Sequence, residues 1–126
     1  MDNPLAVRDY HRLEIWRRAH ALAIAVHEAA RRLRGNHFTA LRSQLTRAAD
    51  SVAATIVEGC GASTARDFAR FLDMSIKSAS ETEYHLLSAR DGGALVDARW
   101  RKLSSEVGAI RRMTYVYRKR VLEEND

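Results

Sequence analysis

The sequence predicts an all-α protein, an antiparallel up-down-up-down four-helix bundle. Apolar residues recur at intervals of three and four over most of the chain, as they do on one face of a helix, and no segment alternates with the period of two of a strand. The single proline, Pro4, precedes these periodic segments, and glycines interrupt them at three points. Three interruptions leave four long segments, and short connections between long helices favour antiparallel neighbours.

The first helix is expected at about residues 13–34 and the second at about residues 40–59. Gly35 suits the left-handed residue that often follows the last turn of a helix, and Thr39 is a candidate N-cap of the second helix. The first helix has a clear apolar face at helical spacing. Its members are Ile15, Ala19, Leu22, Ala23, Val26, Ala30 and Leu33.

The third helix is expected at about residues 65–91 and the fourth at about residues 98–122. Thr64 begins a sequence with the shape of a capping box, although Asp stands three residues later where Glu is preferred. Asp97 is a candidate N-cap of the fourth helix. A chain of 126 residues can form one hydrophobic core, so residues 1–126 are predicted to be a single domain.

The composition is that of a globular protein with a moderate excess of positive charge. Hydrophobic residues make up 46% and charged residues 29% of the chain, and 21 Lys and Arg against 16 Asp and Glu give a formal net charge of +5. Cys60 is the one cysteine, so an internal disulfide is excluded. Neither a signal peptide nor a membrane-spanning apolar run is recognisable, so we expect a cytoplasmic location without membrane contact.

The second helix carries a further face, away from its apolar one, made mostly of small or hydrogen-bonding side chains. Positions 47, 51, 54 and 58 form one stripe at helical spacing. A fully solvated face would carry more Lys and Glu, so this face predicts a subunit interface of a homo-oligomer. The alternative is that the second helix is the most buried helix of a monomer. The candidate interface residues are Gln44, Arg47, Ser51, Thr55 and Glu58.

Basic residues are concentrated in the first 36 residues and on the fourth helix. On the fourth helix, Arg101, Arg112 and Lys119 share one line, opposite the apolar face. Arginine predominates, and its planar guanidinium group suits phosphate oxygens, so this surface is a candidate for binding DNA or RNA. The alternative is an ordinary charged outer face that also complements the helix dipole. The candidate residues are Arg101, Arg112, Lys119, Arg111, Arg118 and Arg120.

The sequence contains no recognisable active site or metal site. A di-metal bundle needs Glu-x-x-His on two helices, and this motif is absent. Cys60 is expected at a helix C-terminus, where the partial negative charge disfavours a thiolate. No catalytic residue, metal or cofactor is therefore predicted, and the protein is not expected to be an enzyme. The five histidines form no ligand set; they are His11, His20, His27, His37 and His85.

Four sequence motifs together carry a family resemblance. They are Leu41-x-x-Gln44-Leu45-x-Arg47-Ala48-Ala49-x-Ser51, Ile56-Val57-Glu58-Gly59, Phe68-x-x-Phe71-Leu72 and Ser78-x-x-Glu81-x-Glu83. The chain resembles the bacterial four-helix bundle protein family from about residue 13 to residue 121. That family includes proteins encoded in intervening sequences of large-subunit ribosomal RNA genes and accessory variability proteins of diversity-generating retroelements.

The resemblance implies an antiparallel four-helix bundle that assembles into a homopentamer, which agrees with the second face on the second helix. For retroelement-associated members it further implies a basic assembly that binds nucleic acid and a reverse transcriptase. Three positions depart from the family pattern. Thr55 stands where Asn is usual, Val57 where Ala is usual, and Lys77 where Gly is usual.

The function predicted from the sequence is a non-enzymatic, homo-oligomeric and pentameric scaffold. Its basic surface is expected to bind nucleic acid through phosphate contacts, because no recognition-helix motif for reading bases is present. The alternative is a protein–protein interaction adaptor whose positive charge is incidental.

Overall fold

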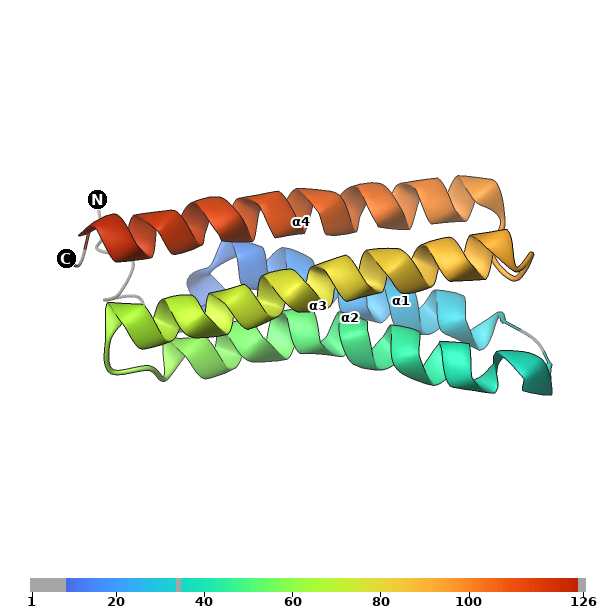
Figure 1. The fold of residues 1–126 in the computed structure, drawn as a ribbon, viewed down its shortest axis with the longest axis horizontal. Coiled ribbons are helices and arrows are strands. Elements are labelled where there is room, and N and C mark those ends of the chain that lie inside the picture. Colours follow the sequence, from blue (N-terminus) through green and yellow to red (C-terminus); the bar gives the residue numbers. More distant parts are fainter. Residues whose placement is uncertain (1–8, 34, 125–126) are drawn as a thin grey trace.

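The computed structural model of the chain describes residues 9–33 and 35–124. Four long helices make up the fold: α1 (Glu14–Arg31), α2 (Thr39–Cys60), α3 (Ala65–Asp91) and α4 (Asp97–Glu124). Two short 3-10 helices, η2 (Tyr10–Arg12) and η3 (Asn36–Phe38), precede α1 and α2. Figure 1 shows the four long helices side by side, each running opposite to the one before it. The described residues therefore form the predicted up-down-up-down bundle and contain no strand.

The first connection differs from the expected one. α1 ends at Arg31 with Arg32 as its C-cap, and Arg34, the expected end, lies outside the described residues. Gly35 has a positive φ of 104°, but with ψ at 150° it precedes η3 instead of ending α1. Thr39 is the first residue of α2 and not its N-cap, because η3 continues directly into the helix and already gives Thr39 helical backbone angles.

The second and third connections follow the sequence more closely. Thr64 is the N-cap of α3, and its Oγ1 accepts a hydrogen bond of 3.0 Å from the backbone N–H of Asp67. This is the N-cap half of the predicted capping box. α4 begins at Asp97, one residue earlier than expected, so this carboxylate lies in the first helical turn, where it complements the helix dipole.

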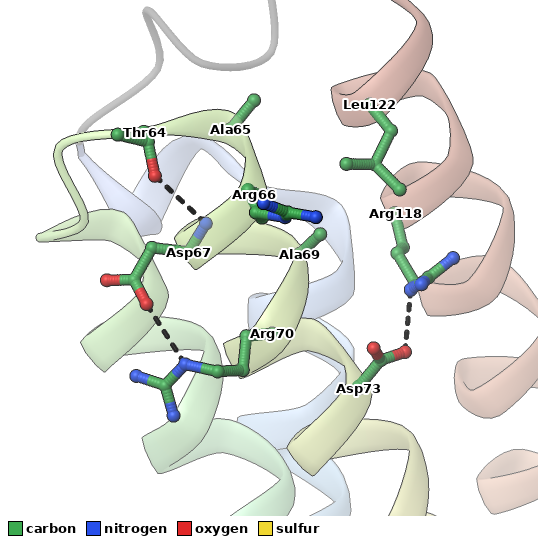
Figure 2. Close-up of a pocket in the computed structure, with 9 residues that line it drawn as sticks. All are labelled: Thr64, Ala65, Arg66, Asp67, Ala69, Arg70, Asp73, Arg118 and Leu122. Atoms are coloured by element: carbon green, nitrogen blue, oxygen red, sulfur yellow. Dashed lines mark hydrogen bonds and ion pairs between the residues drawn. The ribbon is translucent and has the colours of Figure 1, made fainter.

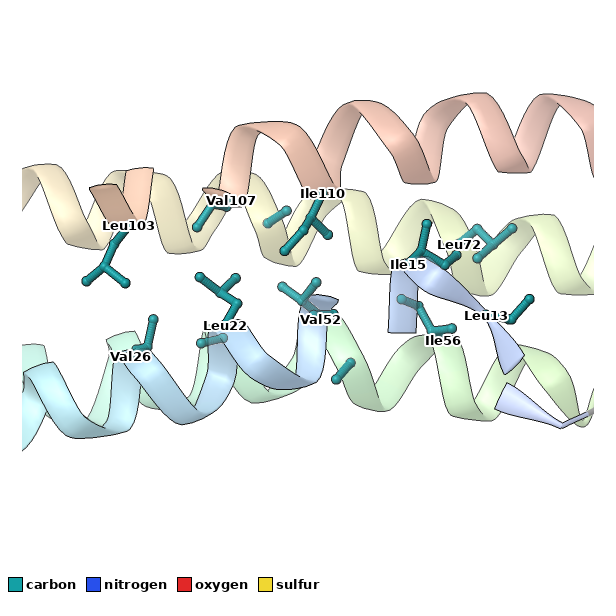
Figure 3. Packing of buried hydrophobic residues seen from close by; sticks show 14 of the residues in the cluster. Leu13, Ile15, Leu22, Val26, Val52, Ile56, Leu72, Leu103, Val107 and Ile110 are labelled. Atoms are coloured by element: carbon teal, nitrogen blue, oxygen red, sulfur yellow. The ribbon is translucent and has the colours of Figure 1, made fainter. Parts of the chain in front are cut away.

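The core lies along the bundle axis and receives side chains from all four helices (Figure 3). Leu22 of α1, Ile56 of α2, Leu72 of α3 and Ile110 of α4 are almost completely buried. Burial of each such side chain stabilises the fold by about 1.5–3 kcal/mol. Phe68 is also fully buried and is the largest side chain in the core.

The α2–α3 contact is close because small residues lie along it. A Cβ atom added to Gly59 would lie 2.9 Å from the ring of Phe68 and 3.0 Å from Cβ of Phe71. Further along, the Ser75 hydroxyl donates a hydrogen bond of 2.7 Å to the backbone carbonyl of Val52. Small residues on both helices therefore serve packing within the subunit.

The α1–α4 contact is the least extensive of the four contacts between neighbouring helices. α1 has 18 residues and α4 has 28, so α4 is longer by about 15 Å of helix axis. We call the contact between α1 and α4 the α1–α4 seam. A salt bridge lies in the middle of it: the Arg18 guanidinium donates two hydrogen bonds of 3.0 Å to the Glu106 carboxylate. None of the described helices is long and apolar enough to cross a membrane.

Candidate nucleic-acid and subunit interfaces

The outward line of α4 is the clearest basic feature of the surface. Arg101, Arg112 and Lys119 are all exposed. Their spacings of eleven and seven residues are near-whole numbers of helical turns, so they point in almost the same direction. We call these three residues the outward row. It presents three cations along about 27 Å of helix axis.

The members of the outward row differ in their local partners. Arg101 forms an ion pair with Asp97, one turn earlier, and Asp97 also pairs with Arg90 at 2.9 Å. The guanidinium of Arg112 extends over Gly108, since a Cβ at that glycine would lie 3.3 Å from Arg112 Nη1. Arg112 and Lys119 form no ion pair with any described residue, so their charges face solvent uncompensated.

Arg111 and Arg118 do not belong to this open surface. Both turn toward α3 and form ion pairs with acidic residues, Arg111 with Glu83 at 2.7 Å and Arg118 with Asp73 at 2.6 Å. The Nε atom of Arg118 approaches the carboxylate as an ion pair without the geometry of a hydrogen bond. Both arginines are half-buried and already neutralised, which makes them structural contacts between α3 and α4.

Arg120 lies on the opposite side of the outward row, toward α1. Its Nε is 3.4 Å from Glu124, one turn later on the same helix. The six candidate basic residues are therefore divided among three directions, and the outward row contains only half of them.

The candidate subunit interface on α2 is also divided. Gln44, Arg47 and Glu58 are exposed, whereas Thr55 has an exposed fraction of only 5%. The Thr55 hydroxyl donates a hydrogen bond of 2.6 Å to the backbone carbonyl of Ser51. Thr55 is thus part of the subunit interior, because its position on the helix turns it toward α3.

Ser51 lies at the border between α2 and α3. Its hydroxyl accepts a hydrogen bond of 2.8 Å from the Ser78 hydroxyl. Together with exposed neighbours on both helices these serines line a polar groove of about 550 Å³. Its polar lining consists of Gln44, Arg47, Ser51, Ser78, Glu81 and His85.

A hollow of about 1090 Å³ lies at the end of the bundle where α3 begins and α4 ends (Figure 2). Three arginines line it, but two of them are paired within the hollow: Arg70 with Asp67 at 3.0 Å, and Arg118 with Asp73. Figure 2 shows both pairs as dashed lines. The acidic partners compensate most of the positive charge, so this hollow has little attraction for an anion.

The groups with catalytic potential are dispersed or buried. Cys60 is a buried thiol in the core and forms no disulfide with the described residues. Burial raises the pKa of the nearby Tyr117 phenol to about 12, with the neighbouring Cys60 as a further contribution. His27 pairs with Asp50 at 2.9 Å between α1 and α2. Among the described residues, no three His, Cys, Asp or Glu side chains are grouped as metal ligands would be.

One contact was not anticipated from the sequence, the salt bridge between Arg18 and Glu106. Arg18 also donates a hydrogen bond of 2.8 Å to the sulfur of Met113. The hydrogen bond with Glu106 raises the pKa of the Arg18 guanidinium. A signal existed in the sequence, because Arg18 lies at the polar edge of the first apolar face, but nothing local identifies a partner 88 residues away.

The fold and these surfaces define a class: a small bundle of four antiparallel helices with a basic outer helix. The chain belongs to the 23S rRNA-intervening sequence protein family, whose family model matches residues 11–116. This finding confirms the resemblance drawn from the motifs on the second and third helices.

A solved structure supports the same fold. The chain is similar to a protein of unknown function from the S23 ribosomal protein family of Bacteroides thetaiotaomicron. The two share 19% sequence identity with a TM-score of 0.76, over 81% of this chain and 95% of the other. At this identity the likeness concerns the fold alone. No curated protein matches the chain.

Proposed function

We propose that the protein is a non-enzymatic, homopentameric scaffold whose α4 surface binds nucleic acid through phosphate contacts. The observation that carries the proposal is the outward row of Arg101, Arg112 and Lys119. All three side chains are exposed, they point in one direction, and two of them have no acidic partner among the described residues.

Phosphate binding fits the chemistry of this row. Guanidinium and ammonium groups on one line can follow the regularly spaced charges of a nucleic-acid backbone. Such contacts fix position but carry no sequence information. The proposed binding is therefore strong at low salt, weak at high salt and largely independent of sequence.

Assembly into a ring supports the same function. Self-association would repeat the outward row once per subunit and so raise the local positive potential. The exposed part of the α2 candidate interface, Gln44, Arg47 and Glu58, is available for contact between copies. The proposed pentamer rests on this exposed polar face and on the assembly that the family resemblance implies.

The test compares two triple variants that remove the same charge. Arg101, Arg112 and Lys119 are replaced by Ala in the first. Arg31, Arg66 and Lys77 are replaced in the control; these side chains are exposed and form no ion pair with the described residues. Binding to duplex DNA and to structured RNA is measured at low salt. We expect the first variant to lose about tenfold or more in affinity and the control to lose less. Equal losses would refute a specific role for the row.

A second candidate is a protein-interaction adaptor. Exposed apolar side chains on the outward half of α3 favour it, namely Met74, Tyr84 and Leu87. Such residues are enriched where proteins meet. Absence of nucleic-acid binding by the wild-type protein at low salt would favour this function.

A further inference from the structure

Two hollows lie along the seam between α1 and α4, one on each side of the Arg18–Glu106 salt bridge. The first, of about 520 Å³, is lined by apolar side chains that include Ile15, Met113 and Val116. The second, of about 550 Å³, is lined by Leu103 of α4 and by Val96, which immediately precedes α4. We call them the Val116 hollow and the Val96 hollow.

Both hollows expose apolar surface to solvent. Val116 is 57% exposed and Val96 is 70% exposed, although β-branched aliphatic side chains are usually buried. Both hollows lie where α1 and α4 run side by side, and the contact between these two helices is the least extensive among neighbouring helices in the bundle. Each has the volume of a pocket for a small molecule or for one base of a nucleic acid.

The rims of both hollows are basic. Arg12, Arg112 and Arg120 line the Val116 hollow together with one acidic residue, Glu14. The Val96 hollow is lined by Arg99 and Lys102 and also by one acidic residue, Glu28. Five basic residues line the two hollows against two acidic ones, and Arg120 also pairs with Glu124 beyond the rim. The remaining excess of positive charge favours an occupant that combines an apolar body with negative charge.

The shape of the seam distinguishes between two such occupants. An acidic amphipathic helix of a partner needs a continuous apolar groove. The Arg18–Glu106 salt bridge interrupts the seam between the hollows, so no continuous groove is present. Lys102 and Val116 are separated by about 21 Å of helix axis, which an extended strand of several nucleotides can span.

We propose that the α1–α4 seam binds a single strand of nucleic acid, with an unpaired base in each hollow and the adjacent phosphates on the rim arginines and lysine. Arg112 belongs both to the rim of the Val116 hollow and to the outward row. The same strand can therefore contact the outward row through its phosphates and the hollows through its bases. This inference rests on the proposed function. A duplex keeps its bases stacked inside and cannot fill the hollows without flipping them out.

The test uses the full chain, a labelled oligothymidylate of about 20 nucleotides and a duplex of equal length. The variant carries Val96→Gln and Val116→Gln, which remove apolar surface without a change of charge. Tyr84→Gln is the control, since Tyr84 is exposed on α3, away from the seam. All three proteins should have the same helix content, because the replaced side chains are mostly solvent-exposed.

We expect the wild-type protein and the Tyr84 variant to prefer the single strand by about tenfold at equal salt. The double Gln variant should lose most of this preference, while its affinity for the duplex changes less than about twofold. Equal binding of strand and duplex, or no effect of the double variant, would overturn this inference and leave phosphate binding by the outward row standing. No binding of either probe at low salt would overturn the proposed function and this inference together.

Discussion

Two glycines in helices of this bundle have opposite local surroundings. Gly59 faces the rings of Phe68 and Phe71, where an added Cβ would approach to 2.9 Å. Gly108 faces only the flexible end of Arg112, with a closest approach of 3.3 Å. The same substitution should therefore have opposite consequences at the two positions.

We predict that Gly59→Ala lowers the free energy of unfolding by about 1–3 kcal/mol, because the aromatic rings and the α2–α3 backbones must move apart. Gly108→Ala is the matched control. It should be neutral or raise stability by up to about 1 kcal/mol through better helix propensity, since Arg112 can move away. Urea denaturation of both variants measures the difference. A stable Gly59 variant would show that α2 and α3 are less closely packed than described.

Tyr117 provides a pH-dependent prediction. Its folded-state pKa is raised from 10.0 to about 12 by burial, so the folded protein favours the neutral phenol. The contribution of the neutral phenol to the free energy of unfolding is fully present below pH 10 and is lost as the pH rises from 10 to about 12. Absorbance titration should show a late-ionising phenol that Tyr117→Phe removes. The same variant should lose stability less steeply across that pH range, and an unchanged titration would contradict the assignment.

At the scale of the helices, the periodicity of apolar residues predicts the four helices but not which residues of neighbouring helices contact one another. The helical spacing of apolar residues depends only on local sequence, and all four helices begin and end within about three residues of the expected bounds. The burial of Thr55 and the pairing of Arg111 and Arg118 depend on which neighbouring helix each face meets. A signal was available for the arginines. Arg111 and Arg118 are seven residues apart on α4, and their partners Glu83 and Asp73 follow in reverse order along α3. Antiparallel helices require this reversed order.

The Arg18–Glu106 salt bridge is the main polar tie between α1 and α4. Both side chains are about a third exposed or more, so solvent weakens their interaction. In a double-mutant cycle of Arg18→Ala and Glu106→Ala we expect a coupling free energy of about 0.5–1 kcal/mol. The coupling should decrease at high salt. A coupling of zero at low salt would mean that the α1–α4 seam is held by apolar contacts alone.

At the scale of the whole molecule, the charge distribution is the feature on which the proposed function rests. The chain carries a net charge of +5, and much of the excess lies on α1 and α4. Four of the six candidate basic residues pair with an acidic side chain: Arg101 with Asp97, Arg111 with Glu83, Arg118 with Asp73 and Arg120 with Glu124. Helical spacing gives the direction of a side chain, whereas its compensation by an acid on another helix appears only in the folded structure.

Self-association can be tested without disturbing the subunit. Ala54 is exposed on the α2 stripe, between Arg47 and Glu58. We predict that the wild-type protein has the mass of the proposed pentamer and that Ala54→Arg reduces it toward that of one chain, because a long cation prevents close approach of a second copy. Ser80→Arg, on the exposed side of α3, is the control and should leave the assembly intact. Light scattering gives the mass, and an unchanged mass for the Ala54 variant would exclude this face as the interface.

The most direct test of the central claim is the dependence of nucleic-acid affinity on salt concentration. The wild-type protein should show a steep linear fall of log affinity with log salt, because phosphate contacts release counterions. Replacing Arg101, Arg112 and Lys119 by Ala should lower both the affinity and the slope, more than the Arg31, Arg66 and Lys77 control does. A wild-type protein without measurable binding at low salt, or two triple variants with the same slope, would contradict the account.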